Sequence, residues 1–147
     1  MATAVNRQGS ASNNIFNHHI VVEGDGYIAI AADASVIANT TSIVAGRNGL
    51  REPDAGKSWC DLGTIAKNGT GQYEITLEQQ YCRLLSAVPI LSVNGTANFR
   101  VVMGTDNVRL STAKGSQKLI FIIVNSSGAA ADPNVALGIR FHARFKK

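Results

Sequence analysis

A short run at residues 55–58, Ala-Gly-Lys-Ser, ends in the way that a phosphate-binding loop ends. In such a loop the glycine-rich backbone and the lysine hold the phosphates, and the final hydroxyl binds Mg²⁺. The motif needs another glycine five residues before Gly56, and that position holds Arg51. A buried strand before the run and a long helix after it are also missing. The sequence therefore does not predict nucleotide binding.

The three histidines are the next candidates, as metal ligands. His18 and His19 are adjacent, and adjacent residues of a strand point to opposite faces, so one metal site would rarely use both. His142 lies between Arg140 and Arg144, whose positive charges disfavour its protonation. The sequence offers His142 no evident carboxylate partner. The histidines therefore predict no metal site, and no motif predicts a cofactor.

The two cysteines, Cys60 and Cys82, are the candidate nucleophiles. Covalent catalysis needs a base beside the nucleophile and an acid that orients the base. His142 and Asp61 are available for these roles, but no local motif groups them with either cysteine. We therefore expect that the protein is not an enzyme. The sequence shows no export signal, so both thiols are expected to be buried, reduced and slow to react.

The elements that would position any site include two strands near the end of the chain. Residues 118–125 are a continuous run of mostly β-branched and aromatic residues, which predicts a strand in the middle of a sheet, buried on both faces. After a loop at 126–134, residues 137–145 alternate between apolar and polar types, which predicts a strand with one wet face. We expect the two strands to form a final hairpin that closes the core.

Turn residues divide the first part of the chain into short strands. Gly-Asp-Gly at 24–26 separates the apolar runs 20–23 and 27–31, which predicts a first hairpin. Residues 35–38 and 42–45 form a second apolar pair around a polar turn. The beginning of the chain is therefore expected to add two hairpins to the fold.

The middle of the chain begins with an irregular stretch at 46–57, which is expected to be a surface loop and a place for partner contacts. Asn-Gly-Thr at 68–70 then joins the strand-like runs 59–67 and 71–77. Asn-Gly between two such runs is one of the stronger hairpin signals. In the second run the odd-numbered residues are apolar and are expected to face the core.

Residues 77–88 place their apolar side chains at helical spacing, which predicts one or two helical turns that end before Pro89. Three further strands are predicted at 90–93, 98–103 and 107–111. The result is about nine or ten strands, spaced about 8–12 residues apart. We therefore predict an all-β fold: an antiparallel β-sandwich, jelly-roll-like, with at most one short helix.

The first residues of the chain differ in composition from the rest. Residues 1–16 are mostly small and polar without a period, which predicts an extended N-terminal arm before a single β-sandwich domain at 17–147. Ile15 and Phe16 would anchor this arm. The arm either stays disordered or orders against a neighbouring subunit. No apolar run approaches the roughly 18 residues that cross a bilayer, so no membrane contact is expected.

The net charge of +4 is unevenly distributed. Residues 1–78 contain five Lys or Arg against eight Asp or Glu (−3), and residues 79–147 contain nine against two (+7). Such a basic half suits an acidic protein surface or nucleic acid, or it protects sheet edges from aggregation. The alternation at 137–145 separates the arginines from the phenylalanines. Base stacking, and hence a nucleic-acid partner, is not expected, although phosphate contact stays open.

Several segments of the second half together match a known pattern. They are Gly-Gln-Tyr-Glu-Ile-Thr-Leu at 71–77, Tyr81, Leu-Leu-Ser-Ala at 84–87, Gly-Ala-Ala-Ala-Asp-Pro at 128–133, and the basic-apolar strand that follows. With these segments the chain resembles small β-sandwich structural proteins of tailed bacteriophage virions, which serve as head decoration, cement or fibre components. The chain departs from that pattern in its basic end, Lys146-Lys147, and its first half resembles nothing specific.

The resemblance implies a capsid decoration or cement protein that is made in the host cytoplasm and binds and stabilises the outside of a phage head. The expected partners are the major capsid protein and further copies of the chain, as a homodimer or homotrimer. The alternative is a tail-fibre or lectin-like receptor-binding module, which should present an exposed aromatic or metal-binding pocket. Trp59, beside Cys60, is instead expected in the core.

The residues expected to contact a partner are the basic side chains of the arm, the loop and the last strand, together with the two apolar anchors of the arm. They are Arg7, Ile15, Phe16, Arg47, Arg51, Arg140, Arg144, Lys146 and Lys147. The resemblance adds no catalytic residue to this set.

Overall fold

The computed structural model describes residues 20–38, 56–93, 98–104 and 117–147. In these ranges eight strands form two four-stranded sheets, and there is no helix. The first sheet has the order β2-β1-β8-β5, with β2 at Trp59–Cys60, β1 at Val21–Ile30, β8 at Leu137–Lys146 and β5 at Arg83–Val93. The second has the order β3-β4-β7-β6, with β3 at Gly63–Lys67, β4 at Gln72–Leu77, β7 at Lys118–Val124 and β6 at Arg100–Met103.

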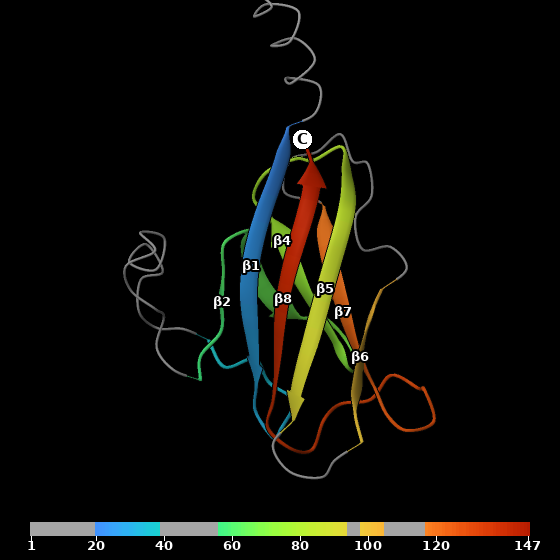
Figure 1. The fold of residues 1–147 in the computed structure, drawn as a ribbon. Coiled ribbons are helices and arrows are strands. Elements are labelled where there is room, and N and C mark those ends of the chain that lie inside the picture. Colours follow the sequence, from blue (N-terminus) through green and yellow to red (C-terminus); the bar gives the residue numbers. More distant parts are fainter. Residues whose placement is uncertain (1–19, 39–55, 94–97, 105–116) are drawn as a thin grey trace, which may run out of the picture.

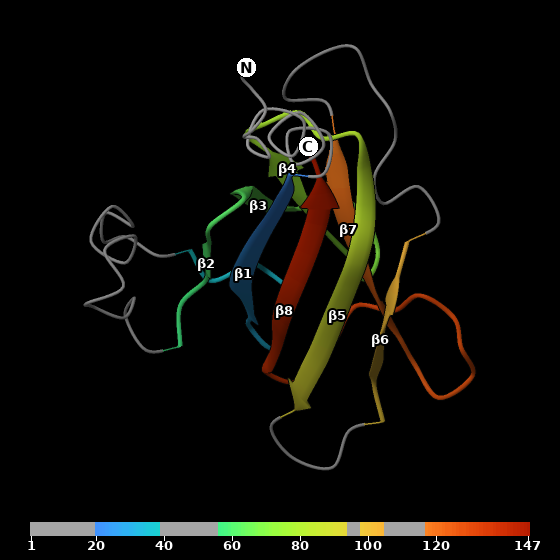
Figure 2. The same ribbon diagram turned by 45° about the horizontal axis from the view of Figure 1, so that its top comes forward.

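All neighbouring strands are antiparallel, and the two sheets lie face to face as the layers of a sandwich (Figure 1). Figure 2 shows the same layers with the top of the molecule turned forward, and β1, β8 and β5 again lie in front of β4 and β7. The predicted all-β antiparallel sandwich is confirmed. The jelly-roll order of the strands stays a prediction. The predicted strands at 42–45 and 107–111, and most of the predicted loop at 46–57, lie outside the described residues.

The core lies between the sheets, where the inward side chains of both layers meet. The rings of Phe121 on β7 and Phe141 on β8 are 5.0 Å apart, and Tyr81 stacks on Phe145 at 4.5 Å. The predicted alternation at 137–145 is confirmed, because its five apolar residues are buried and belong to this core. Burial of such large side chains stabilises the fold by about 1.5–3 kcal/mol each, before the entropy of ordering them is counted.

Strand β7 lies mid-sheet, between β4 and β6, as predicted. Its inward residues Leu119, Phe121 and Ile123 are fully buried, but Ile120 and Ile122 on the other face are only half-buried. The prediction of burial on both faces is therefore wrong. The predicted final hairpin is wrong as well, because β7 and β8 belong to opposite sheets. The chain crosses between the layers after β7, and β8 enters the first sheet between β1 and β5.

The predicted first hairpin at Gly24-Asp25-Gly26 is also wrong, since β1 runs through it without a turn. Both glycines face the core, where a Cβ on Gly24 would lie 2.4 Å from Leu62 and one on Gly26 would lie 2.2 Å from the Phe141 ring. These distances are far below van der Waals contact. The glycines therefore allow close packing inside a strand, which is the second common use of glycine in sheets.

The prediction of helical turns at 77–88 is wrong: Leu77 ends β4, and the long strand β5 begins at Arg83 after a short loop. A register shift between Leu84 and Ser86 interrupts its pairing with β8, and this irregularity disturbs the simple alternation that would have indicated a strand. Tyr81 is buried just before β5, where the side-chain amide of Gln117 bonds both its N–H and its carbonyl at 2.7 Å. Pro89 lies within β5, and an edge strand tolerates the missing donor.

The predicted hairpin around Asn68-Gly69 is confirmed as the pair β3 and β4, although Trp59–Cys60 forms the separate strand β2 in the other sheet. Tyr73, Ile75 and Leu77 face the core as predicted. On the outer face Glu74 is nevertheless 4% exposed, because Lys118 and Asn68 cover its carboxylate with hydrogen bonds of 2.5 and 3.0 Å.

Candidate interaction surfaces

The structure divides the predicted partner-binding residues into three groups. Arg7, Ile15, Phe16, Arg47 and Arg51 lie outside the described residues, as do His18 and His19. Lys146 and Lys147 lie at one end of the first sheet, and Arg140 and Arg144 lie on its outer face. The four described cations therefore belong to two different regions of the first sheet, its outer face and its end, and Lys146 continues the outward row of β8 into the second region.

The first surface, which we call the basic end, consists of Ile20, Val21, Arg83, Lys146 and Lys147. Lys146 on the internal strand β8 lies opposite Val21 on one side and opposite Arg83 on the other. The Lys147 N–H donates to the Ile20 carbonyl at 3.0 Å, and the Cys82 N–H donates to the Lys146 carbonyl at 2.7 Å. Figure 1 shows the start of β1, the start of β5 and the end of β8 together at the top of the molecule.

Apolar and positively charged side chains are mixed at the basic end. Ile20 and Val21 are 45% and 41% exposed, Arg83 and Lys147 are exposed, and Lys146 is half-buried. The Lys147 ammonium donates to Gln79 at 2.9 Å. Among the described residues none of the three cations forms an ion pair. Their charges are therefore open to an acidic partner.

The outer face of the first sheet carries a ladder of charges between β1 and β8. The His142 ring contacts the Asp25 carboxylate through Nδ1 at 2.6 Å and the Glu23 carboxylate through Nε2 at 3.1 Å. Arg144 pairs with the same Glu23 at 3.3 Å. The strand register explains this pattern, because Asp25 lies opposite His142 and Glu23 lies opposite Arg144.

The expectations for His142 were wrong on both points. It has two carboxylate partners, and its hydrogen bonds to Asp25 and then to Glu23 raise its pKa above the ordinary value. The arginines on either side in the chain do not reverse this effect. Because both ring nitrogens face carboxylate oxygens, the doubly protonated ring matches the site best.

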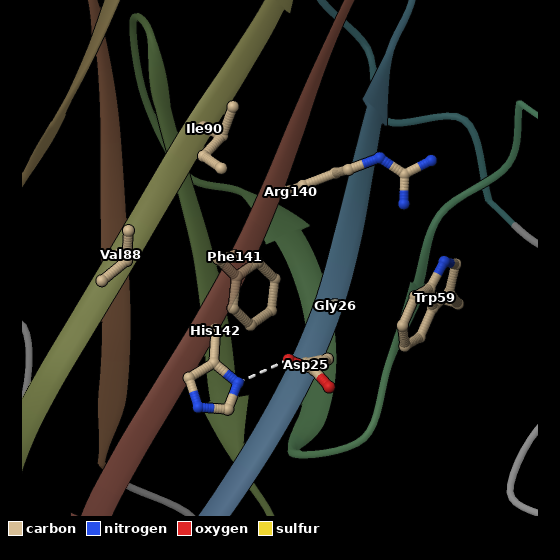
Figure 3. Close-up of a pocket in the computed structure, with 8 residues that line it drawn as sticks. All are labelled: Asp25, Gly26, Trp59, Val88, Ile90, Arg140, Phe141 and His142. Atoms are coloured by element: carbon tan, nitrogen blue, oxygen red, sulfur yellow. Dashed lines mark hydrogen bonds and ion pairs between the residues drawn. The ribbon is translucent and has the colours of Figure 1, made fainter. Parts of the chain in front are cut away.

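Beside this ladder the outer face is hollowed into a groove with a volume of about 310 Å³ (Figure 3). Its lining residues come from all four strands of the first sheet. They are Asp25, Gly26, Trp59, Val88, Ile90, Arg140, Phe141 and His142. Val88 and Ile90 on the edge strand β5 are 55% and 63% exposed, which makes them the most exposed large apolar side chains of the described residues.

Trp59 forms the other end of the groove, on β2. The prediction that it belongs to the core is wrong, since the side chain is half-buried and faces outward beside Tyr27, its partner in the strand pairing. The guanidinium of Arg140 lies 4.8 Å from the centre of the Tyr27 ring, a cation–π contact. Sequence reasoning missed this groove, because Trp59 and Tyr27 lie far apart in the chain and only the pairing of β1 with β2 joins them.

The two cysteines are free, and they differ in exposure. Burial raises the pKa of Cys60 to about 11, and its sulfur accepts a hydrogen bond from the Leu62 N–H at 3.2 Å. Cys82 is exposed, so the expectation that both thiols are buried is wrong for this residue. Slow reaction stays a prediction for Cys60, whose thiolate is suppressed at neutral pH.

The residues singled out as a possible phosphate-binding loop have a structural role where they are described. Ser58 is buried, and its hydroxyl accepts a hydrogen bond from the Ala29 N–H at 2.8 Å. In the described ranges no three His, Cys, Asp or Glu side chains come together as a metal site would require. Those ranges also contain no helix of the length and apolarity needed to cross a bilayer.

No protein-family model, no curated protein and no solved structure matches the chain. The sandwich, the basic end and the groove therefore carry the evidence for function. Both surfaces are built largely on paired strands and combine exposed apolar groups with charge, the composition expected of a binding surface.

Proposed function

We propose that the chain is a structural protein of a bacteriophage virion, which binds the outside of the head and stabilises it as a decoration or cement protein. Its partners are the major capsid protein and further copies of itself, in a homodimer or homotrimer. The segments at 71–87 and 128–133 support the virion assignment by resemblance, and the basic end supports attachment. The proposal assigns no catalytic residue.

One observation carries the attachment model: the basic end lies where the chain enters the first sheet. Ile20 is bonded to Lys147 through the backbone, and Val21 lies beside Lys146. Residues 1–16 end only four positions before Ile20, a stretch that spans about 14 Å when extended. An extended arm that starts here would reach the same partner as the basic side chains, which supports attachment through both.

Attachment through an extended arm has an entropic cost that its contacts must offset. Ordering an extended arm costs roughly 1–2 kcal/mol of backbone entropy per residue, so its contacts must be numerous and largely main-chain, as in a strand added to a partner's sheet. The cations of the basic end add attraction to an acidic surface, and this contribution weakens with salt. Many copies on a symmetric shell make modest affinity at each site sufficient.

Deleting residues 2–14 is expected to leave a folded protein that no longer binds purified heads of the phage that encodes it, because the main-chain contacts of the arm are lost. Co-sedimentation of the truncated protein with heads measures this loss.

Arg83→Gln in the full-length chain is expected to weaken head binding several-fold at low salt and less at high salt, because it removes one unpaired charge of the basic end. Arg100→Gln is the matched control: both arginines are exposed and begin edge strands, but Arg100 lies in the other sheet. Co-sedimentation with heads measures the binding.

Undiminished binding by the truncated protein would contradict the role of the arm. Equal losses from Arg83→Gln and Arg100→Gln would show a general charge effect and would contradict the role of the basic end. Circular dichroism of each variant separates lost binding from lost folding, since the native protein is expected to give a β-sheet spectrum.

The virion itself gives a second prediction. A decoration protein is expected in hundreds of copies per particle, in a fixed ratio to the major capsid protein, because it covers a symmetric shell. Quantitative mass spectrometry of purified virions measures this ratio. Absence of the protein from purified virions would contradict the proposal.

A few dozen copies would instead favour the second candidate function, a tail-fibre or lectin-like receptor-binding module. The groove supports that alternative, because Trp59 is available to a ligand there and is not sealed in the core. Physical separation of heads from tails before the mass spectrometry places the copies and decides between the two functions.

A further inference from the structure

We propose that the groove on the outer face of the first sheet binds a saccharide, with the indole of Trp59 as its stacking platform and Asp25 and Arg140 as its polar contacts. This inference stands on the groove alone and needs no head attachment. The groove lies on one face of the sandwich, and it shares no residue with the basic end.

The register of the strands builds the groove from two parallel rows of outward side chains. One row runs from Trp59 through Arg140 to Ile90, and the next contains Asp25, His142 and Val88. Successive outward rows lie about 6.8 Å apart, because each residue of a strand advances about 3.4 Å.

The groove has a floor because the row between these two points inward. That row includes Gly26 and Phe141, both of which line the groove. Both residues point into the core, where the Phe141 ring occupies the position that a Gly26 side chain would take. The groove therefore runs across the strands, over a length of about 14 Å from β2 to β5 at about 4.8 Å per strand.

The lining matches the two sides of a sugar ring. A pyranose has faces of C–H groups and a rim of hydroxyls, so it needs an apolar platform and hydrogen-bonding groups at once. Trp59 at one end and Val88 and Ile90 at the other are apolar, while Asp25 accepts and Arg140 donates between them (Figure 3). An aromatic ring beside a few convergent polar groups is the usual composition of a small-molecule site.

The polar groups of the groove are held in place by other parts of the first sheet. Asp25 is paired with His142 at 2.6 Å, and the guanidinium of Arg140 lies against the Tyr27 ring. The charges of Asp25 and His142 therefore offset one another, and the Arg140 cation is held on an aromatic ring, so both polar groups are fixed in position for hydrogen bonds to a ligand. A volume of about 310 Å³ is at the small end of ligand pockets, which fits one or two sugar rings.

The single tryptophan of the chain makes the inference directly testable, because all indole emission reports on the groove. We would titrate the full-length protein with glucose, galactose, N-acetylglucosamine, maltose, lactose and chitobiose, and use glycerol as a control for viscosity and non-ring hydroxyls. At least one saccharide is expected to shift the Trp59 emission saturably in the millimolar range, and glycerol is expected to give no saturable change.

Two substitutions test the polar contacts. Arg140→Gln and Asp25→Asn are each expected to raise the apparent Kd for the responding saccharide at least several-fold. Arg144→Gln is the matched control, because Arg144 is an exposed arginine on the same face of the same strand but does not line the groove. It is expected to bind the saccharide as the unmodified protein does.

Flat emission with every saccharide would overturn the proposal, as would equal binding by Arg140→Gln and Arg144→Gln. An emission shift that depends on protein concentration and not on saccharide, together with dimers in sedimentation velocity, would also overturn the proposal. It would show that this face binds a second copy of the chain. Head binding is a separate readout: the Arg140→Gln variant is expected to lose the saccharide and to keep its attachment to heads, so failure of one proposal does not imply failure of the other.

Discussion

Replacing Phe121 by alanine is expected to lower the free energy of unfolding by about 3–5 kcal/mol, the usual cost of deleting a buried aromatic side chain. Phe121 is fully buried on the mid-sheet strand β7. Its ring lies 5.0 Å from that of Phe141 on the opposite sheet, so it joins the two layers directly. A cavity at this point removes contacts from both sheets, and a well-packed core collapses only partly around it.

Urea unfolding monitored by circular dichroism measures this loss. Val102→Ala is the control, since Val102 lies on the adjacent strand β6 with 40% of its surface exposed, and its truncation is expected to cost less than about 1 kcal/mol. Similar losses for the two variants would contradict the position of Phe121 at the centre of the core.

The second large effect is expected from Lys118→Met, which removes the cation that holds the buried Glu74. The Lys118 ammonium and the Glu74 carboxylate are 2.5 Å apart, and the two side chains are 39% and 5% exposed. Removing one partner of a buried ion pair costs about 3–5 kcal/mol. Because Lys118 is partly exposed, we expect a smaller loss of about 2–3 kcal/mol at pH 7.

The effect has a defined pH dependence. Burial acts to raise the pKa of Glu74, but the hydrogen bonds from Lys118 and Asn68 outweigh it, and the pKa of the folded state is lowered. A lowered pKa means that the ionised carboxylate stabilises the fold above its unfolded pKa of about 4.3, and that this contribution is lost as the pH falls through the folded pKa. In Lys118→Met the burial of Glu74 remains while the hydrogen bond and the charge of Lys118 are lost, and Asn68 alone opposes burial less strongly. Protonation of Glu74 at low pH therefore relieves part of the loss.

The difference in unfolding free energy between the unmodified protein and Lys118→Met is therefore expected to be largest near neutral pH and to shrink as the pH falls below about 4. Urea unfolding at a series of pH values measures it. Lys67→Met is the control, because Lys67 forms an ion pair with the more exposed Asp132 at 3.1 Å, and exposed pairs contribute about 0–1 kcal/mol. A pH-independent difference for Lys118→Met would contradict this account.

Local patterns in the sequence predicted those elements whose signals are themselves local. The alternation at 137–145 identified β8 and its inward face, because a strand with one buried face has a side-chain period of two. Asn68-Gly69 identified the turn between β3 and β4, because the positive φ of Gly69 suits a tight turn. The antiparallel sandwich followed from many such short segments.

Other local patterns fit two different structures, and only contacts with distant parts of the chain decide between them. Gly24 and Gly26 have the composition of a turn, and only Leu62 and Phe141 above them show that they are sites of close packing. The apolar spacing at 77–88 fits a helix, whereas in the structure the segment contains the end of β4, a loop with the buried Tyr81 and the first part of the irregular edge strand β5. In each case the deciding contact comes from a distant part of the chain.

The sequence by itself therefore determined the fold class, the inward face of β8 and the basic character of the second half of the chain. Only the tertiary structure decided which charged and aromatic side chains come into contact and which surface they form. His142 meets Asp25 across 117 positions of the chain, Trp59 meets Tyr27 through the pairing of β2 with β1, and Lys147 meets Ile20 at the basic end. The reason is physical: side-chain period is set by neighbours along the chain, whereas a binding surface is set by strand order and register, which depend on non-local pairing.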